Sequence, residues 1–67
     1  MPISARNQLK GTVKSVTQGE AIANVEVDAC GQRIVASITV EAARELELAE
    51  GKAVTAIIKA SDVILAT

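Results

Sequence analysis

The sequence contains no phenylalanine, tyrosine, tryptophan or histidine, and its only cysteine is Cys30. Aromatic side chains each bury about 150–250 Å² and often dominate the cores of small domains. The core of this chain must therefore consist of valine, isoleucine, leucine and alanine, since hydrophobic residues still make up 49% of it. A single cysteine excludes an intrachain disulfide, and the lack of histidine argues against a structural zinc site.

The length of 67 residues corresponds to one domain, residues 1–67. A domain of this size buries only about 60% of the surface that its unfolded chain exposes, so its own core is marginal. Small domains usually compensate with disulfides, a metal or oligomerisation. Because the composition argues against the first two, the sequence predicts a homo-oligomer.

Charge and hydropathy indicate neither a polyanionic partner nor a membrane. Seven basic and eight acidic residues give a net charge of −1, which leaves no basic surface for nucleic acid or an acidic membrane. No apolar run approaches the roughly 20 residues that span a bilayer. The first residues also lack the charged and apolar regions of a signal peptide. We expect a soluble cytoplasmic protein, and the free Cys30 is compatible with that reducing compartment.

Alternating apolar and polar residues predict a chain made mainly of β-strands. The expected strands cover residues 9–15, 20–28, 32–39, 53–59 and 63–66. Residues 40–48 contain strong helix formers instead, and Thr39 before them is a suitable N-cap. The order predicts an all-β fold, a small five-stranded OB-like barrel with one short helix between strands 3 and 4.

The period of two also assigns the faces of the strands. On the first strand one face is expected to hold Leu9, Gly11, Val13 and Ser15. On the second and third strands the apolar faces are expected to hold Ala21, Ala23, Val25 and Val27, and Ile34, Ala36 and Ile38.

Residues suited to catalysis are scarce. Without histidine the chain lacks the side chain that most often acts as a base near neutral pH. Cys30 lies in a predicted turn beside Asp28, with no cationic neighbour in the sequence to stabilise a thiolate. The carboxylates of the predicted helix are best explained as its solvated face. We therefore expect no catalytic residues and no enzymatic activity.

Two polar segments concentrate hydrogen-bond donors. Residues 4–8, Ser-Ala-Arg-Asn-Gln, precede the first predicted strand, and residues 59–62, Lys-Ala-Ser-Asp, end the fourth. Cations and hydroxyls beside free backbone N–H groups are suitable ligands for a doubly charged oxyanion. Taken alone, each segment is still better explained as an ordinary polar strand end.

These segments closely resemble the signature segments of the molbindins, free-standing members of the transport-associated OB family. The resemblance covers residues 3–11 and 56–63, with 36–39 and 48–52 between them in the same order, and it spans essentially the whole chain. It implies a homohexamer, a trimer of dimers, that binds molybdate or tungstate at subunit interfaces for intracellular storage or homeostasis. It implies no cofactor, and any metal is bound as the oxyanion.

The resemblance also implies which residues bind the oxyanion. The corresponding positions are Ser4, Arg6, Thr39, Lys59 and Ser61, with Asn7 and the backbone of Ala60 as weaker candidates. Where some relatives carry a further hydroxyl on the short helix, this chain has alanine at position 42. A donor-only site suits molybdate, which is fully deprotonated at neutral pH, whereas a protonated phosphate also needs an acceptor.

Two other functions remain open at this stage. One is an OB-type nucleic-acid-binding module, although such modules stack bases on aromatic residues and this chain has none. The other is a regulatory module that recruits a protein partner in response to the anion. The start at Met1, without a linker, favours a free-standing protein but leaves a ligand-dependent partner open.

Overall fold

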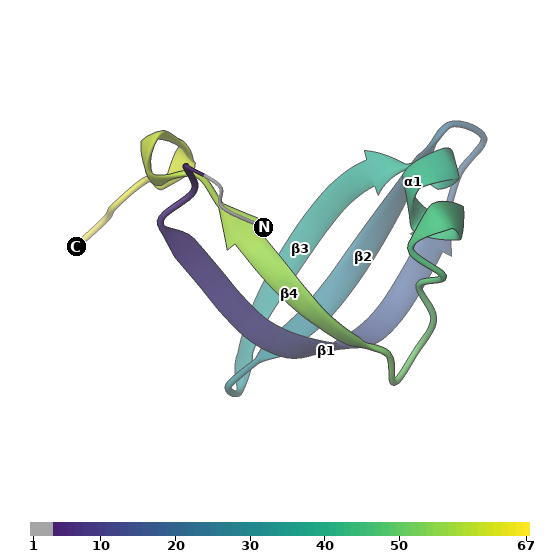
Figure 1. Ribbon diagram of the computed structural model, residues 1–67, viewed down its shortest axis with the longest axis horizontal. Coiled ribbons are helices and arrows are strands. Elements are labelled where there is room, and N and C mark those ends of the chain that lie inside the picture. Colours follow the sequence, from purple (N-terminus) through teal and green to yellow (C-terminus); the bar gives the residue numbers. More distant parts are fainter. Residues whose placement is uncertain (1–3) are drawn as a thin grey trace.

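The computed structural model describes residues 4–67 and consists mainly of one antiparallel sheet (Figure 1). The four strands of this described part stand in the order β3-β2-β1-β4. In chain order the elements are β1 (Asn7–Gln18), β2 (Ile22–Ala29), β3 (Gln32–Thr39), α1 (Val40–Glu45), β4 (Ala53–Ile58) and the 3₁₀ turn η1 (Ala60–Asp62). The all-β class and the position of the helix between strands 3 and 4 agree with the sequence prediction.

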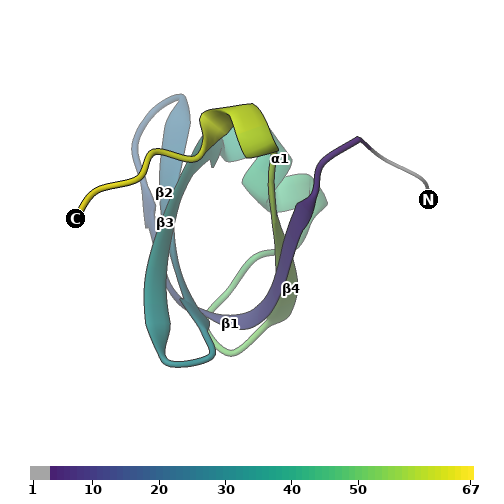
Figure 2. The same ribbon diagram turned by 90° about the vertical axis from the view of Figure 1, so that its left-hand side faces the viewer.

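The sheet curls because β1 belongs to two halves of it. The first half of β1, up to Thr12, pairs with β4, and from Thr12 onward β1 pairs with β2. Gly11 lies at this change of partner, where a Cβ atom would stand only 2.5 Å from the backbone oxygen of Asp28. Figure 2 shows the resulting shape, with β2 and β3 on one side and β1 and β4 on the other.

The face predicted to hold Leu9, Gly11, Val13 and Ser15 is kept only as far as Val13, and Leu9 on it is 41% exposed. The register with β2 shifts between Val13 and Ser15, which is a β-bulge. The backbone N–H and C=O of Val13 also bond to Lys52 and Gly51, each at 2.9 Å. Because a bulge inserts one residue, the alternation reverses: Ser15 is exposed and Val16 is half-buried.

Small aliphatic side chains form the core, as the composition requires. One cluster contains Val13, Val25 and Val27, and a second joins Ala23 to Val40 and Ala43 of α1. Ile34, Ala36 and Ile38 of β3 are partly buried and pack against these clusters. The predicted faces at residues 23–27 and 34–38 therefore point inward, whereas Ala21, predicted on the face of Ala23, precedes β2 and is exposed.

The helix is shorter than the predicted range of residues 40–48. Thr39 caps it as expected, since its Oγ1 accepts a hydrogen bond from the backbone N–H of Ala42 at 3.0 Å. At the other end Glu47 has φ of 54°, and Leu48 donates its N–H to the carbonyl of Ala43 at 3.0 Å. This is the pattern of a Schellman motif, which ends the helix before the last helix-forming residues.

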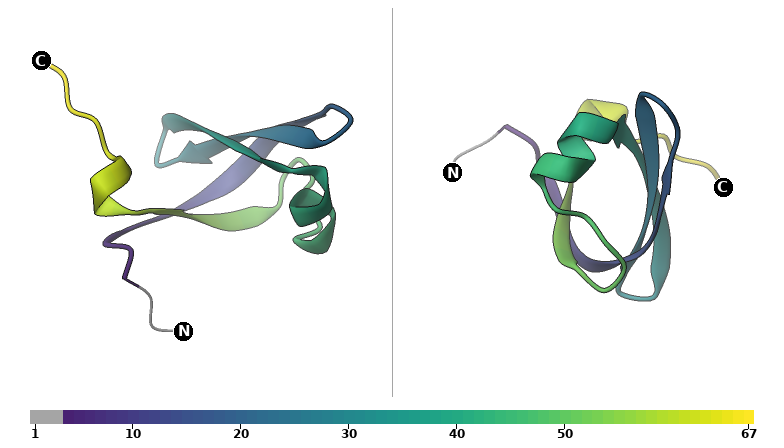
Figure 3. Two further views of the ribbon diagram at one scale, coloured as in Figure 1. Left: turned by 90° about the horizontal axis from the view of Figure 1, so that it is seen from above. Right: turned by 90° about the vertical axis from the view of Figure 1, so that its right-hand side faces the viewer.

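The fifth strand predicted at residues 63–66 is not a strand in this chain. After η1 the tail runs away from the sheet (Figures 1 and 3). Ile64 and Leu65 are 92% and 88% exposed. Because η1 turns the chain aside at the end of β4, the tail does not fold back onto its own sheet, and the described chain forms a curled four-stranded sheet without a fifth strand. Neither helical segment among residues 4–67 is long and apolar enough to cross a membrane.

Candidate functional site

The pairing of β1 with β4 brings the two donor-rich segments to the same end of the sheet. Asn7, the first residue of β1, lies opposite Ile58, the last residue of β4. Their neighbours Arg6 and Lys59 therefore leave the sheet together, and Figure 1 shows the start of β1 beside η1. Sequence positions more than fifty residues apart thus lie at one polar end of a single subunit.

Most candidate side chains at this polar end are accessible to solvent. Ser4, Arg6, Lys59 and Ser61 are all exposed. Lys59 is the N-cap of η1 and makes no capping bond through its side chain, while its carbonyl accepts the N–H of Asp62 at 2.8 Å. Two cations and two hydroxyls of these segments can donate hydrogen bonds to a tetrahedral anion, and the segment with Lys59 and Ser61 also carries the carboxylate of Asp62.

Asn7 has a different environment from these exposed residues. Its side chain is half-buried, and its Nδ2 donates a hydrogen bond to the backbone carbonyl of Ile58 at 3.2 Å. One donor of the amide is thus used within the chain, across the β1–β4 ladder. The sequence placed Asn7 among the weaker ligand candidates, and nothing in its local pattern indicates this bond.

Thr39 is not part of the polar end. It pairs with Ile22 and precedes α1, at the opposite end of β1 from Arg6. The 12 residues of β1 separate the two ends, and an extended strand rises about 3.3 Å per residue. Within one copy of the chain, the β1–β4 pairing places the segments that carry Arg6 and Lys59 at one end of the sheet and leaves Thr39 at the other. Ser4 precedes Arg6 and Ser61 follows Lys59 on these two segments.

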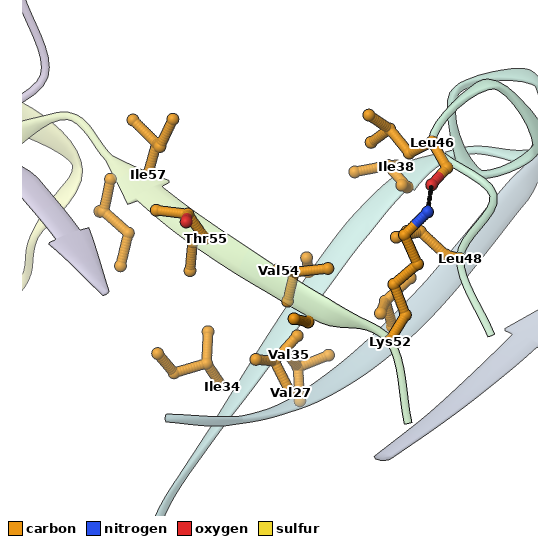
Figure 4. Close-up of a pocket in the computed structure, with 15 residues that line it drawn as sticks. Val27, Ile34, Val35, Ile38, Leu46, Leu48, Lys52, Val54, Thr55 and Ile57 are labelled. Carbon is orange, nitrogen blue, oxygen red and sulfur yellow. Dashed lines mark hydrogen bonds between the residues drawn. The ribbon is translucent and has the colours of Figure 1, made fainter. Parts of the chain in front are cut away.

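An apolar groove between β3 and β4 was not predicted from the sequence. It has a volume of about 700 Å³ and is lined by side chains of β2, β3, β4 and the segment after α1, among them Val27, Ile34, Ile38, Leu48, Val54 and Ile57 (Figure 4). At one end Lys52 donates from Nζ to the carbonyl of Leu46 at 3.0 Å. The sequence of β4 could have indicated this groove, because the strand is apolar at nearly every position, which is typical of a strand covered on both faces.

Among the described residues a second, polar hollow places cations beside carboxylates. This hollow of about 130 Å³ on the outer face contains Lys14 and Asp28, and there Arg33 forms an ion pair with Glu26. Cys30 is exposed in the turn between β2 and β3. No three His, Cys, Asp or Glu side chains within residues 4–67 come close enough to hold a metal cation.

Comparisons with known proteins agree with this fold. Residues 3–65 match the model of the TOBE domain. A probable molybdenum-pterin-binding protein of Haemophilus influenzae is 46% identical over 66 residues, which cover 97% of this chain and 96% of that protein. A molybdate binding protein from Sporomusa ovata superposes with a TM-score of 0.95 at 37% identity, over 100% of both chains. The cytoplasmic molybdate-binding protein ModG gives a TM-score of 0.86 at 46% identity, over 90% of this chain and 43% of that longer one.

Proposed function

This chain belongs to the TOBE domain family, and from that premise we propose that it binds molybdate or tungstate at subunit interfaces of a homo-oligomer, for intracellular storage or homeostasis. The observation that carries the proposal is the pairing of Asn7 with Ile58, which sets Arg6 and Lys59 at one end of the sheet. Relatives that cover nearly the whole chain are named for molybdenum or molybdate, which supports this choice of anion.

The donor set at the polar end suits a dianion with four acceptor oxygens. Arg6 and Lys59 together offset its two charges, and hydrogen bonds from charged groups are about twice as strong as neutral ones. The hydroxyls of Ser4 and Ser61 and the backbone N–H of Ala60 supply further donors. A fully deprotonated anion can accept from every one of these groups, whereas a protonated phosphate would have to use a serine hydroxyl as the acceptor for its own proton.

In this proposal Thr39 is supplied by a second subunit. Thr39 ends β3 beside the start of β2, at the opposite end of the sheet from the polar end of its own chain. The Oγ1 atom of Thr39 already accepts a hydrogen bond from Ala42, so its hydroxyl hydrogen is free to donate to the oxyanion. A site that needs two copies of the chain couples ligand binding to assembly, because ligand then stabilises the oligomer by mass action.

The apolar tail and the apolar groove support the oligomeric state. Ile64 and Leu65 are almost fully exposed, and β3 and β4 are the two edges of the sheet. We propose that residues 63–66 of one subunit enter the groove of another and form there the fifth strand that closes the barrel. Burial of each of these two side chains contributes about 1.5–3 kcal/mol. The stoichiometry that we propose is a hexamer, a trimer of dimers.

We place the protein in the cytoplasm, and the description of the relative ModG as cytoplasmic supports this placement. A buffered store of molybdate there requires reversible binding that ignores the more abundant sulfate. Since sulfate has the same charge and shape but a smaller size, the dimensions of the interface must provide the selectivity.

Equilibrium dialysis of the purified oligomer tests the proposed function. Molybdate is offered in excess sulfate, with tungstate in a parallel arm and a molybdenum–pterin complex in a third, and bound metal is measured by elemental analysis. We expect molybdate and tungstate to be retained and sulfate to be excluded. If only the pterin complex is retained, the ligand is that complex and not the free oxyanion. If no arm retains metal, the proposal is wrong.

A further inference from the structure

A single side-chain hydrogen bond ties the two donor-rich segments together. Nδ2 of Asn7 donates to the carbonyl oxygen of Ile58 at 3.2 Å, across 51 positions of the sequence. Asn7 directly follows Arg6, and Ile58 directly precedes Lys59. The bond therefore joins the immediate neighbours of the two cations in the candidate site.

The location of this bond allows it to influence the positions of Arg6 and Lys59. Asn7 and Ile58 form the last pair of the β1–β4 register, and Arg6 and Lys59 lie beyond the paired strands. The ends of a ladder open more readily than its centre. Asn7 and Ile58 are both half-buried, whereas Arg6 and Lys59 are exposed. A partly sheltered bond at the last pair thus adds a constraint where the backbone pairing stops.

The cations themselves make such a constraint useful. Without a bound anion, two positive charges at the same end of the sheet repel each other. Repulsion favours separation of the chain ends that carry Arg6 and Lys59, and each separation must be reversed before both can contact one ion. Groups held in their bound arrangement beforehand bind more tightly, because less freedom is lost on binding.

We propose that Asn7 is a positioning residue of the oxyanion site: through the carbonyl of Ile58 it holds Lys59 beside Arg6 and does not itself touch the ion. This inference rests on the proposed function. The competing role is that of a direct ligand, since the amide of Asn7 has a second N–H. The two roles differ in a measurable way, because a positioning residue acts only through the residue that it positions.

A double-mutant cycle on the assembled protein separates the two roles. Molybdate affinity is measured by calorimetry for wild type, Asn7→Ala, Lys59→Ala and the double variant. We expect Asn7→Ala to weaken binding about tenfold in wild type and less than twofold in Lys59→Ala. In Arg6→Ala, which lacks the other cation of the repelling pair, the effect of Asn7→Ala should likewise fall below twofold, whereas a direct ligand would keep its tenfold effect in both backgrounds. Gln8→Ala, the removal of an exposed neighbouring amide, is the matched control and should change affinity less than twofold.

The alternatives give distinct results. A tenfold loss in the Lys59→Ala background as well would make Asn7 a direct ligand and overturn the inference while leaving the proposed function intact. An unchanged affinity of Asn7→Ala would overturn it equally. Failure of the wild type to bind molybdate would remove both proposals. If Asn7→Ala does not assemble, Asn7→Ser takes its place in the same cycle, because the shorter serine side chain cannot span the distance to Ile58.

Discussion

Gly11 of β1 lies so close to Asp28 of β2 that a Cβ atom on the glycine would stand 2.5 Å from the backbone oxygen of the aspartate. This approach occurs where β1 exchanges β4 for β2 as its partner, and so where the sheet curls. The curl leaves the groove between β3 and β4 open, and it sets the polar end apart from Thr39. One close backbone contact therefore influences both the apolar groove and the layout of the candidate site.

Substitution of Gly11 should destabilise the fold. In Gly11→Ala the added methyl meets backbone that cannot move aside, and such overpacking costs about 1–3 kcal/mol. We expect a fall of this size in the free energy of unfolding, measured by chemical denaturation. Ser15→Ala, at an exposed position of the same strand, is the control and should stay within about 0.5 kcal/mol of wild type. Equal stability of Gly11→Ala and wild type would show that the strands separate easily at the bend.

Removal of either cation at the polar end should weaken oxyanion binding. Hydrogen bonds to charged groups are worth about 1.5–3 kcal/mol, which corresponds to roughly a 10- to 100-fold loss of affinity. Arg6→Ala and Lys59→Ala should each show such a loss in equilibrium dialysis, while light scattering reports an intact oligomer. Lys14→Ala removes an exposed cation from the middle of β1 and serves as the control. Unchanged affinity in both test variants would mean that the site lies elsewhere.

The helix-capping role of Thr39 should be replaceable by other capping residues, whereas its role as a hydrogen-bond donor to the oxyanion should not. Asparagine and aspartate cap helices about as well as threonine or better, so Thr39→Asn and Thr39→Asp should keep the thermal stability of the protein. The carboxylate of Thr39→Asp should abolish molybdate binding by repulsion, whereas Thr39→Asn retains a donor and should bind within about tenfold of wild type. Tight binding by Thr39→Asp would exclude this residue from the site.

Mixed oligomers test whether Thr39 acts from a second subunit. Arg6→Ala and Thr39→Asp subunits should each bind poorly when assembled alone. After joint unfolding and reassembly, an interface between the two types contains one intact set, Arg6 and Lys59 from one chain and Thr39 from the other. Dialysis should then detect restored sites in a fraction of the interfaces. No restoration would mean that Thr39 of a second subunit does not complete the site.

Charged residues in the tail should dissociate the oligomer. Ile64→Asp combined with Leu65→Asp places two carboxylates on the segment proposed to enter the apolar groove, where burial of an unpaired charge is costly. We expect a lower mass in light scattering and loss of molybdate binding, with the β-rich circular dichroism spectrum retained. Thr67→Asp adds a charge beyond the proposed strand and should leave the mass unchanged. An intact oligomer of the double variant would exclude the tail from the interface.

The end of α1 offers a stabilising substitution. Glu47 has the left-handed conformation that costs a non-glycine residue about 1–2 kcal/mol. Glu47→Gly should therefore raise the free energy of unfolding by up to about 1 kcal/mol, although the exposed contact between Glu47 and Lys52 is lost. Glu45→Gly, inside the helix, should lower stability by a similar amount. If Glu47→Gly also lowers stability, the contact between Glu47 and Lys52 contributes more than the relief of the left-handed backbone conformation.

The predictable parts of this fold depend on neighbours in the sequence. Alternation at Ala23, Val25 and Val27 identified a buried face, since side chains of a strand alternate regardless of which strand lies beside it. Thr39 was recognisable as a cap because its partner, Ala42, is only three residues away. The β-bulge between Val13 and Ser15 was not predictable, because it depends on the pairing of β1 with β2 and with the segment before β4.

The candidate site divides in the same way. The sequence by itself determined that two donor-rich segments exist, that the core is aliphatic, and that a domain this small gains from association with its own copies. Only the tertiary structure decided that Arg6 and Lys59 share one end of the sheet, that Asn7 bonds to Ile58, and that Thr39 lies apart. The physical reason is that strand register and the curl of a sheet are set by contacts between distant residues, and local patterns do not contain them.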